Sequence, residues 1–256
     1  MRSFIAFFKK EFLEISRTGK LIILGAIFLL FGIMNPAIAK LTPYMLEMFS
    51  EDLAGSGMVI TEVTVDALTS WTQFFKNIPM ALIAFVLLCG SIFTKEYESG
   101  TLLLVLTKGI ARYKIVFAKT FAMISLWTAG YWLCFSVTYA YNDYFWDNSI
   151  VKGLIPAVID QWIFGILIIA LIVFFSAVSK TFGGVLLGTV GAVALSYVAA
   201  FFPKLASFAP TSLMNSAGLL IGAESFEDYS KTVVTAVVIT VMLIASSIPI
   251  MNKKHL

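Results

Sequence analysis

Residues 157–202 read AVIDQWIFGILIIALIVFFSAVSKTFGGVLLGTVGAVALSYVAAFF. A helix needs about 20 predominantly apolar residues to cross the ~30 Å hydrocarbon core of a bilayer. This stretch holds two such runs, 157–179 and 182–203, with little more than Lys180 and Thr181 between them. It therefore predicts two membrane-spanning helices joined by a tight turn.

Four more apolar runs of spanning length flank this pair, at 21–41, 78–94, 115–141 and 232–251. Of the 256 residues, 59% are hydrophobic and 13% are charged, and the mean hydropathy is +0.92. A soluble domain carries about 25% charged residues, so a water-soluble fold is excluded. The sequence predicts an all-α membrane protein, with a single transmembrane domain over 1–256 that contains six transmembrane helices.

The distribution of charge orients these helices. If the N-terminus lies inside, the inner segments hold thirteen of the eighteen Lys and Arg residues and four acidic residues, whereas the outer segments hold five basic and eleven acidic residues. Lys and Arg concentrate on the cytoplasmic side of membrane proteins. Because the number of crossings is even, both termini are expected in the cytoplasm.

Residues 21–34 also have the character of a signal-peptide core, followed by a small-residue cleavage pattern at 37–39. Against cleavage, the preceding region is long, contains Glu11 and Glu14, and has a pattern of its own. We therefore expect the first apolar run to be a transmembrane helix, with cleavage as the lesser alternative.

The first 20 residues predict an amphipathic helix. Its apolar residues recur at helical spacing, while polar residues occupy the opposite side. Such a helix suits the headgroup plane of a membrane, and a partner protein is the alternative surface. The residues of the apolar face are Phe4, Phe8, Phe12 and Ile15.

The inner loop 95–114 carries an apolar core, Thr101 to Leu106, that is too short to span a membrane. Charged residues flank the core on both sides. A short apolar helix exposed to the cytoplasm needs a partner surface. The alternative is that it folds back on the helices of its own chain or on lipid.

Residues 203–231 include two prolines, two glycines and an apolar part too short to cross the membrane. They predict short re-entrant or interfacial helices before the last span. Near the outer ends of their spans, Lys40 and Asp160 are expected either to pair or to reach the outer interface.

Two spans carry packing signals. Asn35 and Pro36 predict a kink in the first span, where neighbouring groups must satisfy a freed carbonyl. Gly184 and Gly188 form a small-residue pair in the fifth span that permits close helix approach. We expect this face to pack within the chain, with a second subunit as the alternative.

No pattern for catalysis is present. There is no phosphate-binding loop ending in Gly-Lys-Ser/Thr, there is no zinc-protease motif, and the sole histidine is His255. Cys89 and Cys134 lie in apolar segments, which argues against a disulfide framework or a metal site. The chain is therefore not expected to be an enzyme, to hold a metal or cofactor, or to bind nucleic acid.

Together these features resemble one family, the ABC-2 permeases, which are the membrane subunits of type-2 ABC exporters. The amphipathic helix, six spans, long first outer loop and short helices before the last span all fit. Leu103, Gly109 and Ala111 depart from the loop pattern of the family. The residues of the loop that carry the resemblance are Glu96, Glu98, Gly100, Thr101, Leu102, Leu106, Arg112 and Lys119.

The resemblance implies that the loop from Glu96 to Arg112 is a coupling helix, docked on a separate ATP-binding subunit that carries ATP and Mg. It implies two permease chains, identical or related, with two ATPase chains in the cell membrane, and a connecting helix over 1–20 at the inner leaflet. Spans one, two and five would line the path between the permeases, with Asn35 and Gly188 as candidates.

The first functional hypothesis is an exporter of an amphipathic or hydrophobic compound, such as a peptide toxin, an antimicrobial peptide or a drug. A non-transporting ABC subunit with a mechanical, sensory or immunity role is the alternative. An ion-coupled carrier is third, because the span centres carry no acidic residue.

Overall fold

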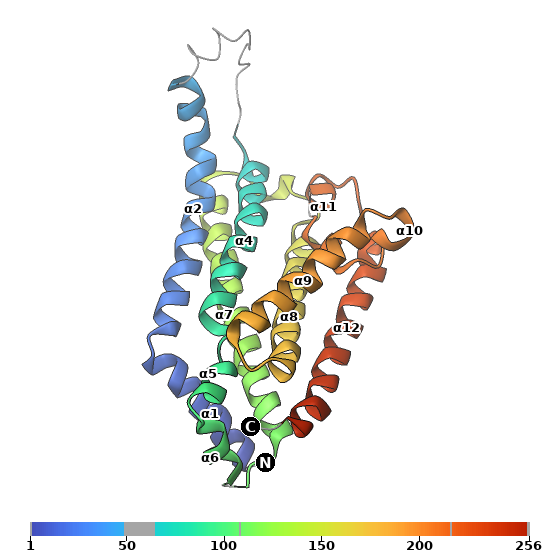
Figure 1. Ribbon diagram of the computed structural model, residues 1–256. Coiled ribbons are helices and arrows are strands. Elements are labelled where there is room, and N and C mark those ends of the chain that lie inside the picture. The colour runs from blue at the N-terminus through green and yellow to red at the C-terminus, as the bar shows by residue number, and fades with distance from the viewer. Residues whose placement is uncertain (1, 49–64, 108, 216, 255–256) are drawn as a thin grey trace.

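The computed structural model describes residues 2–48, 65–107, 109–215 and 217–254, and the regular elements in these ranges are all helical. Six helices are long and apolar enough to cross a membrane, as predicted. Figure 1 shows them as an elongated bundle. They are α2 (Lys20–Met48), α4 (Ala67–Cys89), α7 (Arg112–Phe145), α8 (Leu154–Val178), α9 (Phe182–Ala200) and α12 (Phe226–Lys253).

Short helices gather at the two ends of the bundle. At the end where both termini lie, hereafter the terminal end, are α1 (Arg2–Arg17), α5 (Thr94–Glu98) and α6 (Thr101–Thr107) (Figure 1). At the opposite end are α10 (Pro203–Ala206) and α11 (Ala217–Ile221). Two 3-10 turns complete the order, η1 (Asn148–Ile150) and η2 (Pro210–Met214).

The core is a layer of aromatic side chains between α2, α4, α7 and α8. The Trp127 indole packs 5.8 Å from the Phe28 ring and 5.7 Å from the Phe85 ring, centroid to centroid. A Cβ atom on Gly165 would lie 2.2 Å from Trp127, and one on Gly130 would lie 2.4 Å from Phe28. Small residues therefore make room for large rings, as expected where van der Waals packing holds helices together in lipid.

Helix α4 begins eleven residues before the second predicted span at 78–94. The Asp66 carboxylate caps it by accepting a hydrogen bond from the Thr69 amide at 2.9 Å. Its early turns bury Trp71 and Phe74 and carry polar residues between them. Hydropathy alone therefore places the start of this helix too late, because these turns are amphipathic rather than uniformly apolar.

Side chains of α7 and α4 form hydrogen bonds with the polar groups at the predicted kink site in α2. Pro36 has no amide hydrogen for the Gly32 carbonyl, and the Thr138 hydroxyl donates to that carbonyl instead, at 3.0 Å. The Asn35 amide donates to Thr138 at 3.1 Å and accepts from Asn77 at 2.8 Å. This confirms the prediction that neighbours satisfy the freed carbonyl, and it makes the fully buried Asn35 a packing residue.

The glycine pair of α9 contacts its own chain. A Cβ on Gly188 would lie 2.3 Å from the Phe175 ring of α8, and one on Gly184 would lie 2.2 Å from Ser179 in the α8–α9 turn. Elsewhere α9 is mostly exposed, and it buries only Val185 and Thr189. In this structure Gly188 thus allows α9 to pack closely against α8 of the same chain.

Candidate functional site

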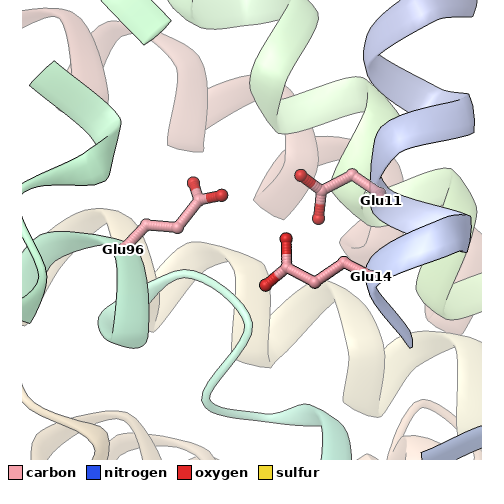
Figure 2. A group of neighbouring side chains, drawn as sticks. All are labelled: Glu11, Glu14 and Glu96. Carbon is pink, nitrogen blue, oxygen red and sulfur yellow. The ribbon is translucent and has the colours of Figure 1, made fainter. Parts of the chain in front are cut away.

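Five charged side chains meet at the terminal end of the bundle and are called here the ion cluster: Lys10, Glu11, Glu14, Glu96 and Lys119. Figure 2 shows the carboxylates of Glu11 and Glu14, from α1, turned toward that of Glu96, from α5. Lys119, from α7, lies 2.9 Å from Glu11 and 3.1 Å from Glu96. Lys10 lies 2.8 Å from both Glu14 and Glu96. The cluster therefore joins α1, α5 and α7.

The centre of the cluster is buried. The side chains of Lys119 and Glu11 are each 1% exposed. The Lys119 ammonium also donates to the Ile92 carbonyl at 3.1 Å, and the rings of Phe7 and Phe93 lie 5.9 and 5.6 Å from it. A buried charge of this kind is tolerated because it is paired and hydrogen-bonded, and removing one partner is costly.

The three carboxylates also have the spacing of a cation site, since one ligand atom from each lies within 4.8 Å of the others. Two ammonium groups already bridge these oxygens, Lys10 between Glu14 and Glu96, and Lys119 between Glu11 and Glu96. The arrangement is that of an ion-pair network, in which lysine supplies the positive charge.

On the exposed side of the cluster, the pKa shifts of Lys10 and Glu14 reflect the same ion pairs. Burial favours neutral Lys10, but hydrogen bonds to Glu14 and Glu96 and the charge of Glu11 outweigh it and raise the Lys10 pKa. Burial likewise raises the pKa of Glu14, but the ion pair with Lys10 outweighs it and holds the pKa below its ordinary value. Both side chains therefore carry charge at neutral pH.

The predicted coupling loop folds into two short helices, and Thr94–Thr107 is called here the α5–α6 hairpin. Gly100 separates the helices with φ +66°, a conformation that suits glycine. Around this turn Glu98, Gly100 and Thr101 are exposed. These three predicted residues form the tip of the hairpin.

Two other predicted residues of the loop face inward. Leu102 is 2% exposed and Glu96 is 5% exposed. The expectation that Leu102 is an exposed apolar residue is therefore wrong, and Glu96 is not part of the exposed surface of this chain. Leu102 and Leu106 are spaced by one helical turn, so they share the face of α6 that folds back on the core, with Leu106 partly buried.

Arg112, at the start of α7, is also occupied within the chain. Its guanidinium donates to the carbonyls of Asn252 at 3.2 Å and Lys254 at 2.9 Å, and to that of Met251. The last carbonyls of a helix lack their usual helical partners, and of these three only Met251 also accepts from a backbone amide of the described residues, that of Lys254 at 3.3 Å. Arg112 therefore caps α12. Within the chain Arg112 thus binds the end of α12, and its contact with another subunit stays a prediction.

The predicted apolar face of helix α1 is split between the chain's own core and the exposed surface. Phe8 packs on Phe121 with ring centroids 5.2 Å apart, but Ile15 is buried with Phe7 and Glu11. Phe12 is 42% exposed, next to Leu13 at 44%. The side chain of Phe4 lies outside the described residues. Sequence reasoning missed Glu11, although it stands four residues from both Phe7 and Ile15 on the buried face.

An apolar groove of 410 Å³ lies between α4, α8 and α9. Thr189 and Tyr197 contribute polar atoms, and the rest of the lining is apolar, including Leu82, Phe164 and Val193. Apolar concavities with few polar groups suit hydrophobic ligands.

Asp160 follows neither expectation, whereas Lys40 is exposed and lies near the end of α7, as expected for a side chain that reaches the interface. Asp160 is 1% exposed, and neither carboxylate oxygen has a hydrogen-bond partner among the described residues. Lys40 lies 3.8 Å above the Phe145 ring. The two residues therefore do not pair, and Asp160 does not reach the outer surface, because α8 is the most enclosed of the six long helices.

Comparison with known proteins gives one finding. The family described as ABC-2 family transporter protein matches residues 5–251, nearly the whole chain. No curated protein and no solved structure matches.

Proposed function

This chain belongs to the ABC-2 family of transporter proteins, and we propose that it is the permease subunit of an ATP-driven exporter powered by a separate ATP-binding subunit. The observation that carries this proposal is the α5–α6 hairpin. Its tip is exposed at the terminal end of the bundle, while Glu96 beside the tip is held by ion pairs to α1 and α7. The hairpin thus presents an exposed tip to a partner, while ion pairs at Glu96 connect it rigidly to the helix bundle.

The docking surface for the ATP-binding subunit is the tip, not the apolar face of α6. Glu98, Gly100 and Thr101 are accessible there, whereas Leu102 is buried in the chain. ATP and Mg bind to the partner in this proposal. Two ATP-binding subunits and two permease chains complete the transporter, so each permease presents one hairpin.

The ion cluster transmits movement of the hairpin. When α5 moves, Glu96 moves with it. Its ion pair with Lys119 couples this movement to α7, and its ion pair with Lys10 couples it to α1. The close packing of buried charges makes this connection stiff. The spanning helix α7 and the N-terminal helix α1 therefore move with the hairpin when the ATPases close.

In the membrane, the terminal end faces the cytoplasm and the protein lies in the plasma membrane. The excess of Lys and Arg in the segments at that end supports this orientation. Helix α1 lies along the inner leaflet, with Phe12 and Leu13 toward the acyl chains. The short helices α10 and α11 lie at the outer surface or re-enter from it.

The substrate is an amphipathic or hydrophobic compound. The apolar groove between α4, α8 and α9 supports this class, since those helices correspond to spans two, four and five. Spans two and five are among those expected to line the path between two permeases. A charged small ion would find few polar partners along this surface.

Docking is tested by co-purification. The chain is co-expressed with candidate ATP-binding subunits, and Glu98→Arg and Thr101→Arg at the tip are compared with Lys204→Glu, an exposed charge change in α10 at the opposite end. We expect retention of the ATPase to fall about tenfold or more for the tip variants and to stay unchanged for Lys204→Glu. Equal retention in all variants would remove the hairpin from the interface.

Export is tested on the reconstituted complex. ATPase activity in proteoliposomes is measured with amphipathic peptides and hydrophobic drugs. Export is measured as ATP-dependent accumulation of a fluorescent peptide inside vesicles whose ATP-binding subunits face outward. Stimulated hydrolysis with transport supports the exporter. A stable complex that hydrolyses ATP without moving any of these probes would favour the non-transporting role instead.

A further inference from the structure

A second set of contacts ties the α5–α6 hairpin to the bundle, apart from the ion cluster. The Lys254 ammonium, just after α12, donates to the carbonyls of Ser176 at 2.9 Å and Ser179 at 2.6 Å. It also lies 4.1 Å above the ring of Tyr97 in α5. The Tyr97 hydroxyl donates to the same Ser176 carbonyl at 3.1 Å.

These contacts close a ring through four helices. Lys254 caps the end of α8, where carbonyls lack helical partners and a positive charge is favoured. The Lys254 carbonyl itself accepts from Arg112, at the start of α7, at 2.9 Å. Tyr97, Arg112 and Lys254 therefore join α5, α7, α8 and α12, and these three residues are called here the latch.

We propose that the latch is a second mechanical connection of the hairpin, in which Lys254 is the positioning residue that links α5 to the ends of α8 and α12. The ion cluster reaches only α1, α5 and α7. Without the latch, no ion pair or hydrogen bond among the described residues joins α5 directly to α8, the most enclosed of the long helices, and a movement of α5 reaches α8 only through α7. This inference rests on the proposed docking of the hairpin.

The charge of Lys254 makes the latch sensitive to pH. Burial and, to a lesser degree, the nearby charge of Lys180 together lower the pKa of Lys254 to about 8. The other charged or titratable groups around it are Tyr97 from α5, Arg112 from α7 and Lys253 beside it in the chain. Loss of the proton removes the attraction to the Tyr97 ring and weakens the contacts with the carbonyls.

The test measures the distance across the latch in the full chain, in nanodiscs. Spin labels are attached at Thr101→Cys in α6 and Val178→Cys at the end of α8, both exposed positions. Lys254→Met removes the contacts, Lys254→Arg keeps a charge at all working pH values, and Lys253→Met is the matched control on an exposed neighbour. We expect one narrow distance distribution for the wild type, Lys254→Arg and Lys253→Met at pH 7.

For Lys254→Met, the population of longer distances should rise about tenfold, as expected when at least one hydrogen bond to a charged group is lost. Raising the pH from 7 to 9.5 should release the same population in the wild type but not in Lys254→Arg. A merely structural role of residue 254 would not produce this pH profile. If Lys254→Met matches Lys253→Met at pH 7, or if Lys254→Arg follows the wild type as pH rises, the latch is overturned.

Transmission is then tested in the complex with the ATP-binding subunit. Addition of ATP and vanadate should change the mobility of the Val178→Cys label in the wild type and much less in Lys254→Met, with the ATPase still bound. An equal change in both would contradict transmission through the latch. Failure of the ATPase to bind at all would instead contradict the proposed docking, because the distance measurement needs this chain alone.

Discussion

The Lys119 ammonium lies 2.9 Å from the Glu11 carboxylate, and both side chains are 1% exposed. The two residues come from different helices, α7 and α1, so this pair fixes the N-terminal helix to a spanning helix. Burying two charges costs several kcal/mol per ion before their attraction is counted. The pair is therefore a poor source of stability but a strong constraint on how α1 sits.

Removing one charge of this pair should lower the free energy of unfolding far more than expected from the effect of removing both charges together. We expect Lys119→Met to lower the free energy of unfolding by about 3–5 kcal/mol, because the buried Glu11 loses the partner of one carboxylate oxygen and keeps only the half-exposed Lys10, at 3.0 Å. The double change Glu11→Met with Lys119→Met should cost clearly less than the sum of the single changes. The measurement is denaturant unfolding in detergent micelles, with the exposed Lys9→Met as the control.

Additive single changes would contradict this coupling. So would a loss below about 1 kcal/mol for Lys119→Met, which is the range of an exposed ion pair.

The acid stability of the chain should reveal the exposed side of the ion cluster. The ion pair with Lys10 outweighs burial and holds the pKa of Glu14 below 4.5, its ordinary value. A carboxyl with a lowered folded-state pKa contributes stability above its unfolded pKa and loses it as pH falls through the folded value. The contribution is thus complete at pH 6 and fades below pH 4.5.

We measure it as the difference in melting temperature between the wild type and Glu14→Gln from pH 7 to pH 3. The difference should be small, equivalent to about 0.2–1 kcal/mol at pH 7 because Glu14 is 43% exposed, and it should vanish at the acid end. Glu98→Gln, an exposed acid that forms no ion pair with the described residues, is the control. A difference that grows toward acid pH would reverse the assigned sign.

How much of the fold and of the ion cluster could be predicted from the sequence depends on how far apart in the chain the contacting residues lie. Six spans follow from local composition, and the satisfied carbonyl at Pro36 follows from backbone chemistry, so both were predictable. The start of α4 was not, because Trp71 and Phe74 are buried by α7 and not by a continuous apolar run. The Lys119–Glu11 pair joins residues 108 positions apart, and only the docking of α1 on α7 brings them together.

The exposed residues of the loop 95–114 were predicted only in part for the same reason. The pattern identified the loop, and Glu98, Gly100 and Thr101 are indeed at its surface. A run of six residues from Thr101 to Leu106 does not reveal which side of a short helix meets the rest of the chain. Leu102 is buried because α6 packs against the rest of the chain, and this packing cannot be derived from the local sequence.

The hydroxyl of Thr138 should matter more than its size. Thr138→Val leaves the Gly32 carbonyl and the Asn35 amide without the partner that each has at about 3 Å. We expect a loss of about 1–2 kcal/mol in the free energy of unfolding. Thr138→Ser keeps the hydroxyl and should lose less. If Thr138→Val is as stable as Thr138→Ser, another group satisfies the Gly32 carbonyl.

Two glycines of α9 provide a matched pair for the packing of that helix. A Cβ on Gly188 would lie 2.3 Å from the Phe175 ring, whereas one on Gly191 would meet no atom within 4 Å. We expect Gly188→Ala to lower the free energy of unfolding by about 1–3 kcal/mol, because a ring body must shift. Gly191→Ala adds the same methyl group in open space, and alanine favours helix by up to about 1 kcal/mol in water.

Thermal unfolding of both variants in the same detergent decides the point, because their difference cancels the shared change in helix propensity. A larger loss for Gly188→Ala places the contact between α8 and α9 at Gly188. Should Gly191→Ala instead be the damaging change, its exposed face would be covered in the membrane, as by a second permease chain, and the role of the small residues of α9 would shift from folding to assembly.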